Sequence, residues 1–171
     1  MNARHVAAAV LVAVAVSVSG CAAPPEPAEP TPTFATEEEA FAAAEETYRA
    51  YVDAVNARRA GDSDPPSPES FLTGTALQDE ITFARQLREQ GRSIRGDNIV
   101  SEVKMLRAEN NLTGVLLWAC IDLSETVVVD AAGANTTPAD RVNRTAVEVS
   151  LDLVGGHFLI STAAAAEVLP C

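Results

Sequence analysis

The hydrophobic period of the chain changes at Gly91, and this change is the strongest constraint on how the chain folds. Before Gly91, apolar residues recur at spacings of three, four and seven, which is the period of a helix buried on one side. After Gly91, the period shortens to about two, which is the period of a strand, and 115–123 is almost continuously apolar, as in a strand buried on both faces or nearly so. The sequence therefore predicts an amino-terminal helical half followed by a sheet.

The first helix has recognisable signals at both ends. Thr36 with Glu39 has the Thr-x-x-Glu form of a capping box, in which each side chain hydrogen-bonds the other residue's backbone N–H. An apolar stripe then runs from Phe41 to Val55 at helical spacing. Gly61 follows two arginines and is a natural stop. We expect one long amphipathic helix between these signals.

A loop and a second helix complete the helical half. The loop after Gly61 contains three prolines, and Ser67-Pro68 is typical of the start of a short helical turn. Thr75 with Gln78 then predicts the opening of a further helix. Gly91 is expected to cap its carboxyl end.

Four segments carry a strand pattern. The cleanest is 146–154, where valine and leucine alternate with polar residues. Gly155-Gly156 follows it and fits a two-residue hairpin turn. The other three segments are 99–106, 115–123 and 157–163. The β-branched run 127–129 is expected to be an extension or corner of the same antiparallel sheet.

The first 20 residues form a separate segment. Arg4 gives a short polar region one positive charge, and an apolar run follows from Val6 to Val18. Such a run would form a helix about 20 Å long, which is short for a hydrocarbon core of about 30 Å. Its length, and the small residues Ser19 and Gly20 after it, are typical of a secretory signal that is cleaved.

The four residues Val18-Ser19-Gly20-Cys21 resemble the lipobox of bacterial lipoproteins. The resemblance implies a signal peptide over residues 1–20 and an acylated Cys21, which carries fatty acids such as palmitate and anchors the chain in membrane lipid. Two or more acyl chains hold a protein stably, because each buried CH₂ contributes about 0.8 kcal/mol. We expect the protein on the extracytoplasmic face of the cell membrane. The alternatives are a secreted protein with an incidental cysteine and an uncleaved short membrane anchor.

Residues 21–36 are expected to form a tether between this anchor and a folded domain over 37–171. The segment contains five prolines and no apolar period, which favours extended polyproline II. The net charge of the whole chain is −12, with 12 basic and 24 acidic residues. That balance lacks the basic footprint of a nucleic-acid-binding protein and of a basic membrane-surface patch.

Helices followed by an antiparallel meander point to an α+β layer. With the segment 116–133 and the closing hairpin 155–161, the chain resembles the NTF2-like superfamily, although Phe158 stands where many members carry tryptophan. The resemblance implies an NTF2-like cone, with amino-terminal helices packed on a curved antiparallel sheet of four or more strands. The open end of such a cone often forms a pocket. The fold does not assign the function, because members include enzymes, transport factors and non-catalytic domains.

The cysteine count predicts one crosslink. If Cys21 is acylated, Cys120 and Cys171 remain, and an even remainder in an exported chain indicates a disulfide. The bridge would close a loop of about 50 residues, which contributes about 4 kcal/mol in the chain-entropy model. The alternative is a buried free Cys120 with a frayed Cys171.

The sequence contains no complete catalytic motif. No cluster has metal-ligand spacing and no phosphate loop is present, so we expect neither a metal nor a cofactor, and we expect His157 to face solvent. A ketosteroid-isomerase-like or hydrolytic enzyme would use Asp122 with a raised pKa, together with Tyr48 or Tyr51. Each of these three residues also fits a structural role. We favour a non-catalytic binding or accessory domain of the cell envelope, with an envelope protein or a small apolar molecule as its partner.

Overall fold

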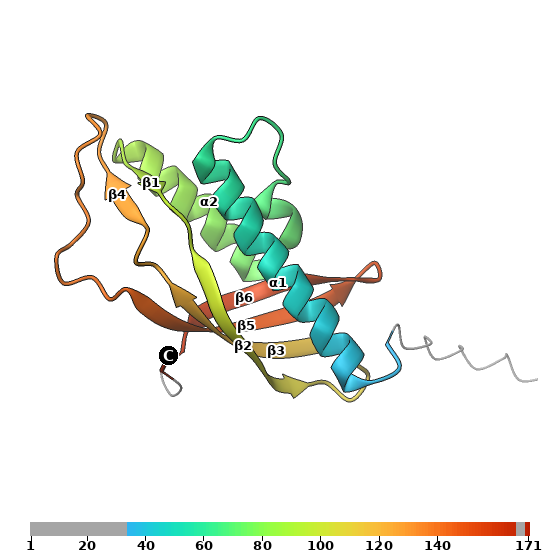
Figure 1. Ribbon diagram of the computed structural model, residues 1–171. Coiled ribbons are helices and arrows are strands. Elements are labelled where there is room, and N and C mark those ends of the chain that lie inside the picture. Colours follow the sequence, from blue (N-terminus) through green and yellow to red (C-terminus); the bar gives the residue numbers. More distant parts are fainter. Residues whose placement is uncertain (1–33, 167–169) are drawn as a thin grey trace, which may run out of the picture. The chain divides into compact units, whose positions relative to one another are not determined.

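The computed structural model describes residues 34–166 and 170–171, and over these residues a pair of helices precedes six strands (Figure 1). The expected signal peptide, Cys21 and the tether up to residue 33 lie outside the described residues. Neither described helix is both long enough and apolar enough to cross a membrane. In chain order the elements are α1 (Glu37–Ala60), the 3₁₀ turn η1 (Pro68–Phe71), α2 (Gly74–Glu89), β1 (Ser93–Arg95), β2 (Ile99–Ala108), β3 (Gly114–Asp122), β4 (Val127–Val129), β5 (Arg144–Val154) and β6 (His157–Ala165).

Helix α1 begins and ends where the sequence predicts. Thr36 Oγ1 accepts a hydrogen bond of 3.2 Å from the backbone N–H of Glu39. The Glu39 carboxylate accepts one of 2.9 Å from the N–H of Ala35, one residue earlier than in a capping box. Gly61 caps the carboxyl end with a φ of 81°, a left-handed conformation that glycine adopts without strain, and its N–H donates to the carbonyl of Arg58.

Helix α2 begins at Gly74 rather than at Thr75. A Cβ at Gly74 would lie 3.3 Å from the carbonyl oxygen of Ser161, so the missing side chain lets the start of α2 approach β6 closely. The helix ends at Glu89, and Gly91 follows two residues later with a φ of 62°. Gly91 therefore lies just beyond the cap position at which it was expected.

The fold class is confirmed: two helices pack on a curved antiparallel sheet of four strands (Figure 1). The strand order is β2-β3-β5-β6, so β3 and β5 are central. Leu117 of β3 lies between Met105 of β2 and Val149 of β5. Gly155 and Gly156 join β5 to β6, and the positive φ angles of both residues suit a tight hairpin turn.

Strand β4 does not belong to this sheet, so the prediction for 127–129 is wrong. It pairs instead with β1, a strand of three residues that the sequence pattern did not reveal. The chain leaves the main sheet in the turn between β3 and β4. The Arg141 guanidinium holds that turn by donating 2.8 Å hydrogen bonds to the carbonyls of Leu123 and Thr126.

The side of the sheet that faces α1 forms the main hydrophobic core. Small residues let the helix approach, since Ala40 and Ala44 are fully buried. Leu117 and Val149 are also fully buried beneath them, and Phe158 belongs to the same cluster. This side of the sheet is therefore filled by packed side chains.

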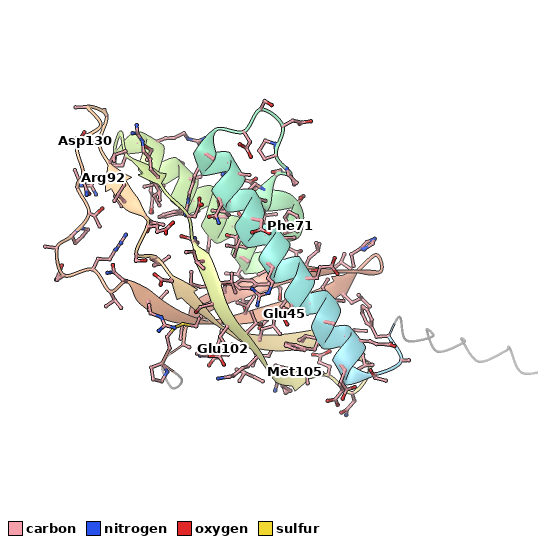
Figure 2. The ribbon with its side chains drawn as sticks, in the orientation of Figure 1. Glu45, Phe71, Arg92, Glu102, Met105 and Asp130 are labelled. Atoms are coloured by element: carbon pink, nitrogen blue, oxygen red, sulfur yellow. A yellow bond between two sulfur atoms is a disulfide. The ribbon has the colours of Figure 1, made fainter. Side chains whose placement is uncertain are left out.

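The opposite side of the sheet carries a smaller cluster of Trp118, Cys120 and Ala146. A disulfide joins Cys120 to Cys171 with a Cα–Cα distance of 5.4 Å, as the cysteine count predicts (Figure 2). It ties the carboxyl terminus to β3. Lys104 places its Nζ 4.8 Å from the centre of the Trp118 ring. Trp118 therefore lies outside the space between the helices and the sheet.

Candidate functional site

A pocket of about 570 Å³ opens between α1, α2 and β1. Its apolar wall combines Val55 of α1, Phe83 and Leu87 of α2, and Ile94 of β1. Both helices reach it with their carboxyl-terminal parts, and the β1–β4 pair brings β1 to the same place (Figure 1). Its volume lies within the usual range of about 300–1,000 Å³ for ligand sites.

Arginines are concentrated in this pocket, which we call the arginine pocket. They are Arg58, Arg59, Arg88, Arg92 and Arg95. They make up five of the 12 basic residues of the chain, whereas two of its 24 acidic residues, Glu69 and Glu80, line the same pocket. The described walls therefore carry a formal charge of +3 in a chain whose net charge is −12.

The positive charge of Arg58 is balanced by carboxylates of the protein itself. Its guanidinium donates to Glu69 Oε1 at 2.8 Å and forms a second ion pair with Glu80. Burial opposes the charge of Arg58, but the bonds to Glu80 and Glu69 outweigh burial and raise its pKa. The two carboxylates that line the pocket are thus both engaged by one arginine.

Tyr51 joins Arg58 and Glu80 in one hydrogen-bonded group of side chains. Its hydroxyl donates to Glu80 Oε2 at 3.4 Å, a long hydrogen bond. Burial, followed by the charge of Glu80, raises the pKa of Tyr51 to about 12, so its hydroxyl stays protonated at neutral pH. Burial also raises the pKa of Tyr48, whose ring centre lies 6.5 Å from that of Tyr51. The two tyrosines line a smaller adjoining cavity of about 180 Å³, which shares Tyr51, Glu80 and Phe83 with the arginine pocket.

Arg59 is fixed by neutral partners. Its Nη1 donates to Asn98 Oδ1 at 2.9 Å. Asn98 is itself held by Asn56, which exchanges hydrogen bonds of 2.9 and 3.0 Å with the backbone of Asn98. Burial lowers the pKa of Arg59, because it removes water from the charged form. Arg59 therefore holds a partly desolvated charge in a set orientation.

The other three arginines differ from Arg58 and Arg59. Arg88, Arg92 and Arg95 are exposed, and no described residue forms a hydrogen bond or an ion pair with their guanidinium groups. Figure 2 shows Arg92 in the segment between α2 and β1, with Asp130 in the neighbouring turn. The Asp130 carboxylate accepts 2.9 Å bonds from two backbone N–H groups of its own turn. The donors of these three arginines are therefore available to a ligand.

The structure does not bring the expected catalytic residues together. Asp122 is the last residue of β3, and its carboxylate accepts a 2.8 Å bond from the N–H of Ser124, which holds its pKa below the usual range. The raised pKa that the enzyme alternative needs at Asp122 is therefore not found, the structural role is confirmed, and Asp122 lines neither cavity that contains the tyrosines. The carboxylate beside Tyr51 is Glu80, which sequence analysis missed because only the packing of α2 on α1 brings the two together.

His157 is exposed at the start of β6, as expected, and lies outside the arginine pocket. Within residues 34–166 and 170–171, no group of three or more histidine, cysteine, aspartate or glutamate side chains is placed to hold a metal ion. The arginine pocket was not recognised from the sequence. Its one signal was the Arg58-Arg59 pair at the end of the apolar stripe, which resembled an ordinary charged helix end.

No family model and no curated protein matches this chain. Solved structures do match its fold. The intermembrane space region of the chloroplast protein ARC6 superimposes with a TM-score of 0.50 at 12% identity, covering 71% of this chain and 92% of that one. Two bacterial structures match less closely. Aln2 from a Streptomyces species has a TM-score of 0.45 at 14% identity, with 76% and 91% covered. A proposed polyketide cyclase from Xanthomonas campestris pv. campestris has a TM-score of 0.40 at 15% identity, with 74% and 90% covered.

At such low identity a structural likeness concerns the fold and nothing finer. The described domain has the NTF2-like fold, with two helices on a curved four-stranded antiparallel sheet. This fold defines a scaffold class that holds enzymes and non-catalytic domains alike. The chemistry of the arginine pocket is therefore the basis for any statement about function.

Proposed function

We propose that this chain is a lipid-anchored protein of the extracytoplasmic membrane face whose NTF2-like domain binds a small molecule in the arginine pocket without transforming it. The observation that carries the binding role is the pocket itself. It joins an apolar wall, including Phe83, to several convergent polar groups in a volume of about 570 Å³. That combination is typical of small-molecule sites.

The hydrogen-bonded group of Arg58, Glu80 and Tyr51 favours binding over catalysis. An isomerase-like mechanism needs a carboxylate that is free to take up a proton next to an oxyanion donor. Tyr51 would serve as the donor, but Glu80, the carboxylate beside it, already forms an ion pair with Arg58. Glu80 is thus occupied in holding α1 and α2 together.

The anchoring half of the proposal rests on the lipobox-like residues Val18 to Cys21 and on the proline-rich segment that follows. Extended polyproline II of about 14 residues would hold the domain up to about 40 Å from the membrane. The domain would then reach solutes or envelope proteins near the bilayer surface.

Metabolic labelling with a palmitate analogue tests the anchor. The wild-type chain should take up the label and sediment with membranes, whereas Cys21→Ala should do neither. Cys120→Ala/Cys171→Ala is the control, because it removes the other two cysteines together and leaves Cys21 in place, so it should keep the label. Equal labelling of wild type and Cys21→Ala would overturn the lipoprotein assignment.

Equilibrium dialysis with a neutral probe, 2-naphthamide, tests the pocket. Ala84 lines it from α2, so the indole of Ala84→Trp should occupy part of it and reduce binding of the probe about tenfold or more. Ala139→Trp, on an exposed loop, should bind like wild type. Circular dichroism of both variants checks that they fold. Equal binding by wild type and Ala84→Trp would contradict a ligand site in this pocket.

A further inference from the structure

We infer that the ligand of the arginine pocket is an amphipathic small molecule that carries a carboxylate or phosphate group. Arg59, Arg92 and Arg95 bind the oxyanion, and the apolar part of the ligand lies against Phe83. This inference rests on the proposed function of the pocket as a small-molecule site. It replaces the small apolar partner expected from the sequence with an anionic one.

The first argument is the distribution of charge. Acidic residues outnumber basic ones two to one in the chain, yet the described pocket walls are net positive. Cations gathered in one wall repel each other, and a cleft lined by one sign of charge focuses its field on ions of the opposite sign. Glu69 and Glu80 form ion pairs with Arg58, and the five arginines of the pocket still outnumber these two carboxylates, so the charge that remains suits an anion.

The second argument is the state of the individual arginines. Arg59 uses Nη1 to hold Asn98, and its remaining donors have no hydrogen-bond partner among the described residues. It is partly desolvated without a carboxylate in hydrogen-bonding contact, which makes an incoming anion favourable there. Arg92 and Arg95 are exposed and have no described partner, so they bind an anion without first breaking an internal ion pair.

The third argument is the apolar wall beside these charges. Phe83 keeps 46% of its surface exposed, which is unusual for a large aromatic residue of a small domain. Leu87 and Ile94 are half-buried in the same wall. An anion with an apolar body would cover this surface while its charged group pairs with guanidinium forks, whose planar geometry matches carboxylate and phosphate.

Equilibrium dialysis of the full chain with three fluorescent probes tests the inference. The probes are 2-naphthoate, 2-naphthyl phosphate and the neutral 2-naphthamide, which share one apolar body. We expect at least one anionic probe to bind about tenfold or more tightly than the neutral one, because charge-assisted hydrogen bonds are added. The two anionic probes separate a preference for carboxylate from a preference for phosphate.

A matched pair of double variants locates the effect. Arg92→Gln/Arg95→Gln should weaken binding of the preferred anion about 10- to 100-fold and leave the neutral probe unchanged. Lys104→Gln/Arg107→Gln on β2 removes the same net charge outside the pocket and should change anion binding less than about twofold, because exposed charges away from the pocket are screened. Both pairs of residues are exposed, so both variants should fold.

The outcomes separate this inference from the function on which it rests. If all three probes bind equally and Arg92→Gln/Arg95→Gln has no effect, the oxyanion assignment is overturned while the pocket remains a ligand site. If no probe binds wild type, both are overturned. If both double variants weaken anion binding equally, the attraction comes from the charge of the whole chain and the assignment to Arg92 and Arg95 is wrong.

Discussion

The core between α1 and the four-stranded sheet and the arginine pocket between α1, α2 and β1 have opposite chemistry, although α1 lines both. Toward the core, α1 presents fully buried Ala40 and Ala44 over Leu117. Toward the pocket, its last turns present Arg58 and Arg59. One helix therefore contributes core residues from Ala40 to Val52 and lines the pocket with its last turns, so substitutions at Leu117 and at the exposed arginines should have separable effects.

The largest expected effect lies on the stability side, at the disulfide. Cys120→Ser/Cys171→Ser opens a loop with a sequence separation of 51 residues. It should lower the free energy of unfolding by about 4 kcal/mol, as the chain-entropy model gives for a loop of this size. Urea unfolding measures the loss, and binding of the anionic probe to the folded variant should be unchanged. Two thiols that alkylate freely in the native, unreduced chain would show that the bridge is absent.

A cavity in the core should have the next largest effect. Leu117 is fully buried, so Leu117→Ala should lower the free energy of unfolding by about 3 kcal/mol. Leu106 on β2 is 39% exposed, and Leu106→Ala is the control with an expected loss below about 1 kcal/mol. Equal losses in the two variants would mean that the core does not lie on the α1 side of the sheet.

Alkaline pH tests the buried tyrosines at the border between core and pocket. Burial raises the pKa of Tyr51 to about 12 and also raises that of Tyr48, whereas an unfolded tyrosine titrates near pH 10. Below about pH 10 both states are protonated, and above it the unfolded state loses its proton first. The free energy of unfolding should therefore fall as pH rises from about 10 to 12, by about 2 to 3 kcal/mol from Tyr51.

Urea unfolding at several alkaline pH values measures this slope. Tyr51→Phe should make it less steep, because phenylalanine has no proton to lose, and the slope that remains should come from Tyr48. An unchanged slope in Tyr51→Phe would mean that Tyr51 titrates like an exposed residue. The side chain of Tyr51, between the core and the arginine pocket, would then be open to solvent.

The smallest stability effects are expected in the arginine pocket. Arg92→Gln/Arg95→Gln should change the free energy of unfolding by less than about 0.5 kcal/mol, because both side chains are exposed and have no described partner. Arg58→Gln should destabilise by about 1 kcal/mol, because it leaves Glu80 without its ion pair. Thermal unfolding compares the variants. A larger loss in Arg92→Gln/Arg95→Gln than in Arg58→Gln would assign Arg92 and Arg95 to stability rather than to binding.

Local signals made most of the fold predictable from the sequence. The cap at Thr36, the stop at Gly61 and the alternation of 146–154 act within a few neighbouring residues. The β1–β4 pair was missed because strands of three residues are too short to show a period. Asp122 ends its strand and its carboxylate bonds to the turn that follows, which agrees with the structural role that the sequence also offered for it rather than with the catalytic one.

The arginine pocket could not be predicted, because tertiary packing assembles it. Arg58 and Glu80 are 22 residues apart, and Arg59 and Asn98 are 39 apart. Each of these side chains is an ordinary polar residue on its own element. They form a site where packing brings α2 and β1 beside the end of α1, and no periodic pattern in the sequence encodes that packing.

An amide chemical-shift map of the isotope-labelled full chain, titrated with 2-naphthyl phosphate and with 2-naphthoate, tests the central claim most directly. The account predicts saturable shifts in the last turn of α1, around Leu87 and Arg88 of α2, and from Arg92 to Arg95. The core around Leu117 should remain unshifted. Shifts centred on Trp118 and Lys104, on the other side of the sheet, would contradict the assignment of the ligand site to the arginine pocket.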